Sequence, residues 1–225
     1  MLLQAFSVIL GVVSVLGAPP SILTASERVV NGTDADAGQF PFIASLQYRG
    51  RHSCGSSIVN KCYVVTASHC VDGTTPEDIS VLVGTVTLNE GGVTHAAEAI
   101  KMHAGYNPNN MYKDDIALVK VRRFRVTGGS VMQHLQKVNI TVYSDADCQS
   151  VHDNTVHDTN ICAGVPEGGK GQCSGDSGGP LIANGHQVGI VSWSVKPCTV
   201  APYPGVYTEI AHYVDWIREN TDDAC

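Results

Sequence analysis

Gly175-Asp176-Ser177-Gly178-Gly179-Pro180 is the most informative stretch of this 225-residue chain. Glycine allows sharp backbone turns, and its missing side chain lets a ligand approach bare amide groups. The backbone amides of Gly175 and Ser177 can therefore point at one spot and hold a developing oxyanion. The stretch predicts a serine presented on a tight turn beside two hydrogen-bond donors.

Two stretches upstream supply the groups that a serine nucleophile needs. Thr66-Ala67-Ser68-His69-Cys70 contains a histidine, and Asp114-Asp115-Ile116-Ala117-Leu118 contains two acids. A serine hydroxyl is a weak nucleophile until a base takes its proton. Imidazole titrates near neutral pH, so His69 is the candidate base for Ser177.

Taken in this order, the three stretches resemble the chymotrypsin-like (trypsin-family) serine proteases, whose TAAHC, DIAL and GDSGGP motifs correspond to TASHC, DDIAL and GDSGGP here. The resemblance runs from Val29 to about Ile217. It implies an all-β fold of two packed six-stranded antiparallel β-barrels with a C-terminal helix, and an active site in the cleft between them. It also implies a secreted, monomeric serine endopeptidase that acts on proteins or peptides and needs no cofactor or metal.

The resemblance assigns a role to each catalytic residue. Ser177 is the nucleophile, His69 the general base, and Asp115 the acid that orients the imidazole and stabilises its charged form. Gly175 and Ser177 supply the oxyanion hole. Asp114 is a rival acid, but the family's aspartate directly precedes Ile-Ala-Leu, which favours Asp115. The spacing of His152, His157 and His186 makes no convincing metal set.

An activation site follows from the same resemblance. Arg28-Val29-Val30-Asn31-Gly32 is similar to the site that an activating protease cleaves in the family. Cleavage after Arg28 would free the amine of Val29, which would then pair with Asp176. Breaking a buried ion pair leaves an uncompensated charge at a cost of about 3–5 kcal/mol, so this pair would act as a switch.

The specificity pocket is also placed by the resemblance. Its floor falls on Gly171, where trypsin-like members carry Asp, and its walls fall on Ser194 and Gly205. We expect a neutral, fairly open pocket that prefers aromatic or large aliphatic side chains to Lys and Arg, because burying an unpaired cation is costly. The Ser192-Trp193-Ser194 backbone is expected to pair with the substrate as an added strand.

The amino-acid composition favours some classes of protein and disfavours others. The chain is 43% hydrophobic and 16% charged, which is typical of a globular domain. Its 23 glycines and 10 prolines indicate many turns, as in a β-rich fold. A formal net charge of −7 disfavours nucleic acid as a partner, since phosphate binding needs a basic face.

The N-terminal region reads as a targeting segment. Residues 1–17 are apolar and small residues follow, which predicts a secretory signal peptide cleaved near Gly17 or Ala18. Residues 18–28 are then an activation propeptide, and residues 29–225 the peptidase domain. The alternative is a membrane anchor, but the run is short and no basic flank follows it.

Eight cysteines in a secreted chain indicate disulfides, although their spacing alone leaves the connectivity open. The family resemblance implies three pairs: Cys54 with Cys70, Cys148 with Cys162, and Cys173 with Cys198. Cys62 and Cys225 match no family cysteine, so their pairing stays open. Asn31 and Asn139 begin glycosylation sequons.

Hydrophobic patterning predicts many short strands and few helices. A serine followed by acids at Ser144 predicts a short helix that carries Cys148. Ala211–Asn220 has the apolar spacing of an amphipathic helix. The expected strands are Phe40–Tyr48, Ser57–Ala67, Ile79–Val83, Ile116–Val121, Gln136–Tyr143, Gln187–Trp193 and Gly205–Ile210.

A second motif also fits the nucleophile. Gly175–Gly179 also satisfies G-x-S-x-G, the nucleophile elbow of α/β-hydrolases. That elbow needs a helix directly after the serine, whereas Pro180 and strand-like segments follow here. The acid and histidine should also follow in that order, but His212 precedes Asp215.

The resemblance breaks at Val121–Thr127. The segment between Asp115 and Ser177 is shorter than in the family by roughly 25–30 residues, equivalent to two or three strands. The end of the first barrel, the connection between barrels and the strand that opens the second are expected to be missing. The nearby Arg122, Arg123 and Arg125 are expected to be solvated. The break leaves open a non-catalytic homologue that only binds, or an unfolded product.

Overall fold

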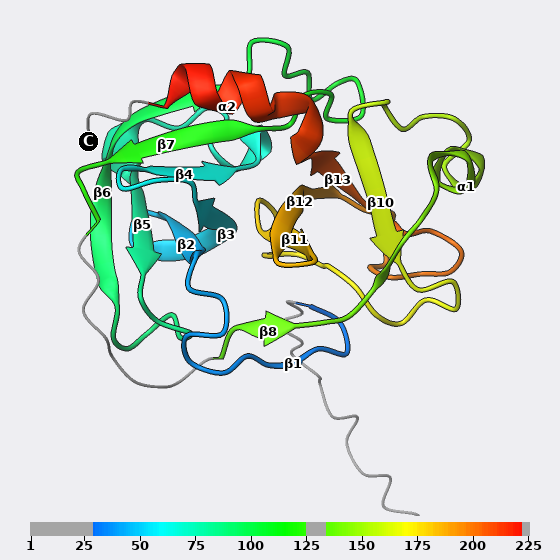
Figure 1. The fold of residues 1–225 in the computed structure, drawn as a ribbon, viewed down its shortest axis with the longest axis horizontal. Coiled ribbons are helices and arrows are strands. Elements are labelled where there is room, and N and C mark those ends of the chain that lie inside the picture. The colour runs from blue at the N-terminus through cyan, green and yellow to red at the C-terminus, as the bar shows by residue number, and fades with distance from the viewer. Residues whose placement is uncertain (1–28, 125–133, 222–225) are drawn as a thin grey trace, which may run out of the picture.

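The computed structural model describes residues 29–124 and 134–221, which form two β-sheet units side by side (Figure 1). The expected signal peptide and propeptide, together with Arg28, Arg125 and Cys225, lie outside these residues. No helix in the described ranges is long and apolar enough to cross a membrane.

The first unit is a closed barrel of six antiparallel strands in the order β2-β3-β4-β7-β6-β5. Alternate residues of these strands point inward and form an apolar core that includes Leu46, Val64, Val81 and Val119, all fully buried. The strands are β2 (Ile43–Tyr48), β3 (Arg51–Ile58), β4 (Tyr63–Thr66), β5 (Ile79–Val83), β6 (Val93–Met102) and β7 (Ala117–Val121).

The second unit is an open five-stranded antiparallel sheet in the order β11-β12-β13-β10-β9. A separate pair, β1 with β8, runs along the lower edge of both units in Figure 1. The bounds are β1 (Thr33–Asp34), β8 (Gln136–Lys137), β9 (Thr141–Val142), β10 (Asn160–Gly164), β11 (Pro180–Ala183), β12 (His186–Trp193) and β13 (Gly205–Glu209).

Helices are few and short. The helix α1 (Asp145–Val151) starts where the hydroxyl of Ser144 accepts a hydrogen bond from the amide of Asp147, 3.1 Å away, and it carries Cys148 as expected. The helix α2 (Val214–Asn220) is preceded by a 3₁₀ turn, Ile210–Tyr213, and covers the first barrel (Figure 1). The remaining 3₁₀ turns are Ser68–Cys70 and Pro76–Asp78.

The apolar layer beneath α2 joins the two units. Tyr213 and the partly buried Trp216 and Ile217 pack with Val65 and Leu118 of the barrel, and the same cluster includes Ile190 from β12. The C-terminal segment therefore fixes the second sheet against the barrel that carries His69 and Asp115.

The all-β architecture with a C-terminal helix is confirmed, and two details differ from expectation. The first barrel closes with six strands, so the expectation that its end is missing was wrong. The second unit has one open sheet in place of a closed six-stranded barrel, which agrees with a truncation between the barrels.

Two expected strands are each broken in two. Ser57–Ala67 spans the end of β3, a turn and β4, because the side-chain oxygen of Asn60 accepts hydrogen bonds from the amides of Cys62 and Tyr63 at 3.0 Å each. Gln136–Tyr143 contains only β8 and β9. None of the expected strands corresponds to β1, β6, β10 or β11.

Three disulfides connect the pairs that the resemblance implies, Cys54–Cys70, Cys148–Cys162 and Cys173–Cys198. The first connects β3 to the turn that holds His69, and the third connects the residue after Gln172 to the residue before Thr199. Cys62 is buried below α2, at 4% exposure.

Candidate active site

Asp115 and His69, which lie at the ends of strands of the first barrel, are hydrogen-bonded to each other. The carboxylate of Asp115 is fully buried, and its Oδ2 lies 2.7 Å from Nδ1 of His69. Its Oδ1 accepts a hydrogen bond from the backbone amide of His69 at 2.9 Å. The hydroxyl of Ser192 donates to Oδ2 at 2.6 Å, and Thr208 donates to the backbone carbonyl of Asp115 at 2.8 Å.

The neighbouring Asp114 has different partners. Its Oδ1 accepts a hydrogen bond from the hydroxyl of Tyr213 at 2.7 Å, and its Oδ2 lies 3.7 Å from Nδ1 of His103. Burial raises the pKa of Tyr213, so the phenol stays a neutral donor. Asp114 therefore fastens the C-terminal segment to the barrel, while Asp115 faces the imidazole of His69.

The loop Gly175–Gly179, which carries Ser177, is hydrogen-bonded to β3 on one side and to β12 on the other. The amide of Gly55 in β3 donates to the carbonyl of Ser177 at 2.7 Å, and the amide of Gly178 donates to the carbonyl of Val191 at 2.8 Å. Gly178 has φ of 76°, and a side chain there would collide with the hydroxyl of Thr66 and the carbonyl of Gly55. Glycine is thus required directly after the serine.

The loop before the serine is held by a histidine that the sequence did not single out. Nε2 of His52 lies 2.9 Å from the carbonyl oxygen of Gly175, and Nδ1 lies 2.8 Å from the hydroxyl of Ser45. These contacts tie β2 and β3 to the loop that carries the expected oxyanion donors. A histidine in an exposed-looking RGRHS stretch gave no signal of this role.

Val29 lies against Asp176. Its backbone nitrogen donates to Oδ2 of Asp176 at 2.6 Å, and the amide of Cys173 donates to the same oxygen at 2.8 Å. The next residue, Val30, donates its amide to the carbonyl of Gly171 at 2.8 Å. In this unbroken chain the nitrogen of Val29 is a peptide amide, and it occupies the place expected for the freed amine.

The expected pocket residues come together, but the pocket is narrower than the sequence predicts. Between Gly171, Ser194, Thr199, Tyr203 and Gly205 the free space is about 10 Å³, about the volume that one water molecule needs. Gln172, to which no motif points, is 8% exposed and lies among these residues.

Tyr112 covers the imidazole from outside. Its ring contacts that of His69 edge-to-face, with centroids 5.6 Å apart. Tyr112 has φ of 54°, and Met111 and Asp114 also have positive φ values, 46° and 53°. Bulky residues seldom adopt this conformation, and such strain gathers at functional sites.

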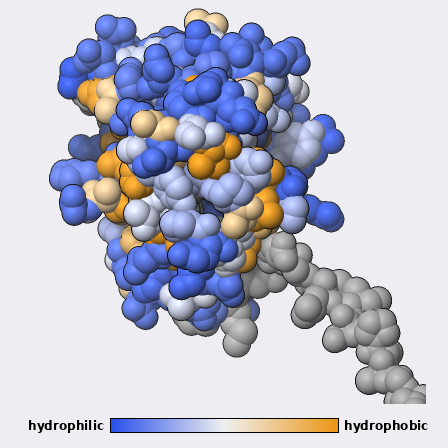
Figure 2. Space-filling view, turned by 90° about the vertical axis from the view of Figure 1, so that its right-hand side faces the viewer, coloured by the Kyte–Doolittle hydropathy of each residue, from blue (hydrophilic) through white to orange (hydrophobic). Residues whose placement is uncertain are grey.

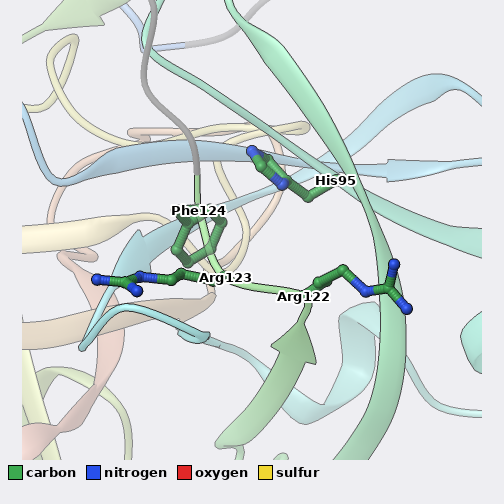
Figure 3. A pocket seen from close by; sticks show the side chains of 4 residues that line it. All are labelled: His95, Arg122, Arg123 and Phe124. Carbon is green, nitrogen blue, oxygen red and sulfur yellow. The ribbon is translucent and has the colours of Figure 1, made fainter.

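Two larger hollows lie elsewhere. One of about 680 Å³ separates the barrel from the second sheet and is lined by Val29, Asp176 and Leu181, among others. The other, about 580 Å³, lies at the sequence break. There His95 and Phe124 face each other while Arg122 and Arg123 point away in opposite directions (Figure 3).

Arg122 and Arg123 are both exposed, as expected for a solvated junction, whereas Arg125 lies outside the described residues. The side chain of Arg122 is 92% exposed and lies 3.6 Å from the carboxylate of Glu98. Within residues 29–124 and 134–221, the one trio with metal-ligand spacing is Cys54, His69 and Cys70. Its sulfurs form a disulfide, so it offers no thiolate ligands.

A closed barrel and a second sheet, a buried aspartate bonded to a histidine, and a glycine-flanked serine loop held against β3 are typical of the class of chymotrypsin-like serine hydrolases. Comparison with known proteins agrees. The trypsin family model matches residues 29–133 and 125–217, so the chain belongs to the trypsin family and is a serine endopeptidase.

Relatives include Trypsin-1 of Astacus astacus, which is 36% identical over 237 residues, covering 85% of this chain and 99% of the relative. Trypsin beta of Drosophila erecta is 34% identical, with 86% and 88% covered. The 237-residue alignment exceeds the part of this chain that it covers, so some of Trypsin-1 has no counterpart here. This agrees with the internal shortening inferred from the motifs, and the binding-only alternative is not favoured.

Proposed function

We propose that the chain hydrolyses peptide bonds with a triad of Ser177, His69 and Asp115. The observation that carries this proposal is the fully buried carboxylate of Asp115, which binds both the ring and the backbone amide of His69. This contact fixes the imidazole with Nδ1 toward the acid. Nε2, which lies 3.8 Å from Sγ of Cys70, is the nitrogen that we assign to Ser177.

The proposed reaction has two stages. In the first, Nε2 of His69 takes the proton of Ser177 as its oxygen attacks the peptide carbonyl, and the imidazolium then protonates the departing amine. The amides of Gly175 and Ser177 stabilise the oxyanion. In the second stage, water attacks the acyl-enzyme by the same proton transfers and releases Ser177.

We propose that the enzyme is a zymogen with a propeptide over residues 18–28, preceded by a signal peptide over residues 1–17. An activating protease would cleave after Arg28 and give Val29 a charged amine. The contact between the nitrogen of Val29 and Asp176, 2.6 Å in the uncut chain, supports this, because a cation there would pair with a partly buried carboxylate.

The proposed substrates are proteins or peptides with apolar side chains before the scissile bond, since Gly171 brings no charge to the pocket floor. The Ser192-Trp193-Ser194 backbone would bind the substrate as an added strand. We propose a secreted monomer. In support, the face over the second sheet is mostly hydrophilic and its apolar patches are separate (Figure 2).

The test compares three proteins on an apolar peptide substrate after treatment with trypsin. The parent should become active, and Ser177→Ala should be at least about 10⁴-fold slower, because the triad acts as a unit. Arg28→Gln should stay inactive. A Ser177→Ala rate above a tenth of the parent's removes Ser177 from its role, and full activity of uncleaved Arg28→Gln removes the activation step.

A further inference from the structure

Gln172 lies inside the pocket that would receive the substrate side chain. It follows the floor residue Gly171, and its side-chain amide donates a hydrogen bond to the carbonyl oxygen of Trp193 at 2.9 Å. That carbonyl belongs to the backbone stretch proposed to bind the substrate. The side chain of Gln172 thus extends from the floor of the pocket, at Gly171, to the backbone of Trp193.

The side chain of Gln172 also fills the space beside Gly205. A Cβ atom placed on Gly205 would lie 2.9 Å from Nε2 of Gln172 and 3.0 Å from its Cγ. These distances mean that the space left by the missing side chain of Gly205 is already occupied. At the floor, a Cβ on Gly171 would lie 3.0 Å from Cγ2 of Thr199, which closes the pocket from below.

The wall behind Gln172 cannot yield easily. His152 is buried, its Nε2 lies 3.1 Å from the carbonyl of Pro204, and its ring packs edge-to-face on Trp193 with centroids 5.1 Å apart. The disulfide Cys173–Cys198 ties the residue after Gln172 to the opposite loop. A large substrate side chain would therefore have to displace Gln172 itself, which would leave the carbonyl of Trp193 without this donor.

We propose that Gln172 sets an upper size limit on the side chain accepted before the scissile bond, so that the enzyme prefers small apolar residues such as Ala and Val. This inference rests on the proposed function and replaces the preference for aromatic and large aliphatic residues expected from the sequence. Its basis is the space of about 10 Å³ left beside Gln172.

Peptide substrates that differ only in the residue before the scissile bond test the limit. The activated parent should have a kcat/KM for Ala and Val at least about tenfold above that for Phe. Gln172→Ser should raise the ratio of kcat/KM for Phe to kcat/KM for Ala at least about tenfold. A parent that prefers Phe, or equal discrimination in both proteins, overturns the proposal.

Gln172→Met is the length-matched control, because it retains the volume and loses the amide. It should keep the discrimination against Phe. If Gln172→Met accepts Phe as readily as Gln172→Ser does, side-chain volume does not set the limit and the proposal fails. Thermal unfolding of each variant shows whether it folds, and Gln172→Ala replaces the Ser variant if that one does not.

A second readout separates this inference from the proposed catalysis. Indole, a free aromatic ring system, should bind to Gln172→Ser in calorimetry and not to the parent, with Ser177→Ala in both backgrounds. Equal indole binding overturns the role of Gln172. If the activated parent with Ser177 intact fails to react with diisopropyl fluorophosphate while the indole difference holds, the proposed function fails and the pocket assignment stands.

Discussion

Asp114 and Asp115 are neighbours in the chain, yet their carboxylates face different groups. Asp115 binds His69 and Ser192, whereas Asp114 binds Tyr213 and lies close to His103. The positive φ of Asp114, 53°, turns the backbone so that consecutive side chains reach separate surroundings. A motif can therefore be matched to the wrong acid by one position, and the contacts discriminate between the two.

Paired substitutions test this division. Asp115→Asn should lower kcat by about 10³–10⁴-fold, because an amide cannot stabilise the imidazolium and favours the wrong tautomer. Asp114→Asn should change kcat by less than about threefold and lower the melting temperature by a few degrees, since a charge-assisted hydrogen bond is worth about 1.5–3 kcal/mol. Steady-state kinetics and thermal unfolding measure both effects. Equal losses of kcat in the two variants would contradict the assignment.

At the scale of elements, α1 is attached to the pocket by His152, the residue that caps its C-terminus. His152 caps α1, lies within hydrogen-bonding distance of the carbonyl of Pro204 and packs on Trp193 and Tyr203. Burial lowers the pKa of His152, although the hydrogen bond to Pro204 opposes the shift. The neutral ring thus stabilises the contact between α1 and the wall of the pocket.

The lowered pKa gives a pH dependence with a definite sign. Below the ordinary histidine pKa of about 6.5, the unfolded chain binds a proton at His152 more readily than the folded protein does. The free energy of unfolding therefore decreases as the pH is lowered. We expect the melting temperature of the parent to drop from pH 7 to pH 5 more than that of His152→Phe, which keeps a ring and does not titrate. Equal slopes in the two proteins would rule out a contribution from His152.

The strands show which parts of the fold a sequence can predict. Ile79–Val83 and Gln187–Trp193 match β5 and nearly all of β12 because their apolar runs are continuous or alternate cleanly. β6 was missed because its residues are mostly half-exposed or exposed and carry Thr, His, Glu and Lys among small apolar residues. Its pairing with β5 and β7 is what makes it a strand, and tertiary pairing leaves little local signal.

The site shows the same division. The motifs placed His69, Asp115 and Ser177 because the chemistry confines their neighbours to a few residue types. They did not place His52, Tyr112 or Gln172, whose contacts depend on segments far away in the sequence. The size of the pocket could not be predicted from Gly171 and Gly205 alone, because Thr199 lies against the space at Gly171 and Gln172 fills the space at Gly205.

At the scale of the whole molecule, the two units are unequal. The first is closed, so each of its strands has two neighbours, whereas β11 and β9 each have one in the five-stranded sheet. The hollow of about 680 Å³ lies beside this sheet, and Leu181 of β11, Ile140 before β9, Val29 and Asp176 all line it. The open edge at β11 and the contact between Val29 and Asp176 therefore border the same space.

This arrangement leads us to expect that the chain is less stable and less active than a version with the shortened segment restored. Unpaired N–H and C=O groups on the edges of an open sheet are costly where water is excluded, at about 1–3 kcal/mol each against a total stability of about 5–15 kcal/mol. An added strand would pair these groups and wall the space around Val29 and Asp176. The fraction of molecules that become active after cleavage should then increase by more than the gain in stability alone explains.

The test grafts the corresponding segment of a full-length trypsin-family relative between Val121 and Leu135. A Gly/Ser insert of equal length is the matched control, because it lengthens the connection and provides no apolar strand. We expect a higher melting temperature and a larger fraction of titratable active sites for the graft alone. If the graft and the parent give equal values, the second unit is complete without the additional strand; if the Gly/Ser insert gains as much as the graft, the length of the connection is the limiting feature and not the open edge.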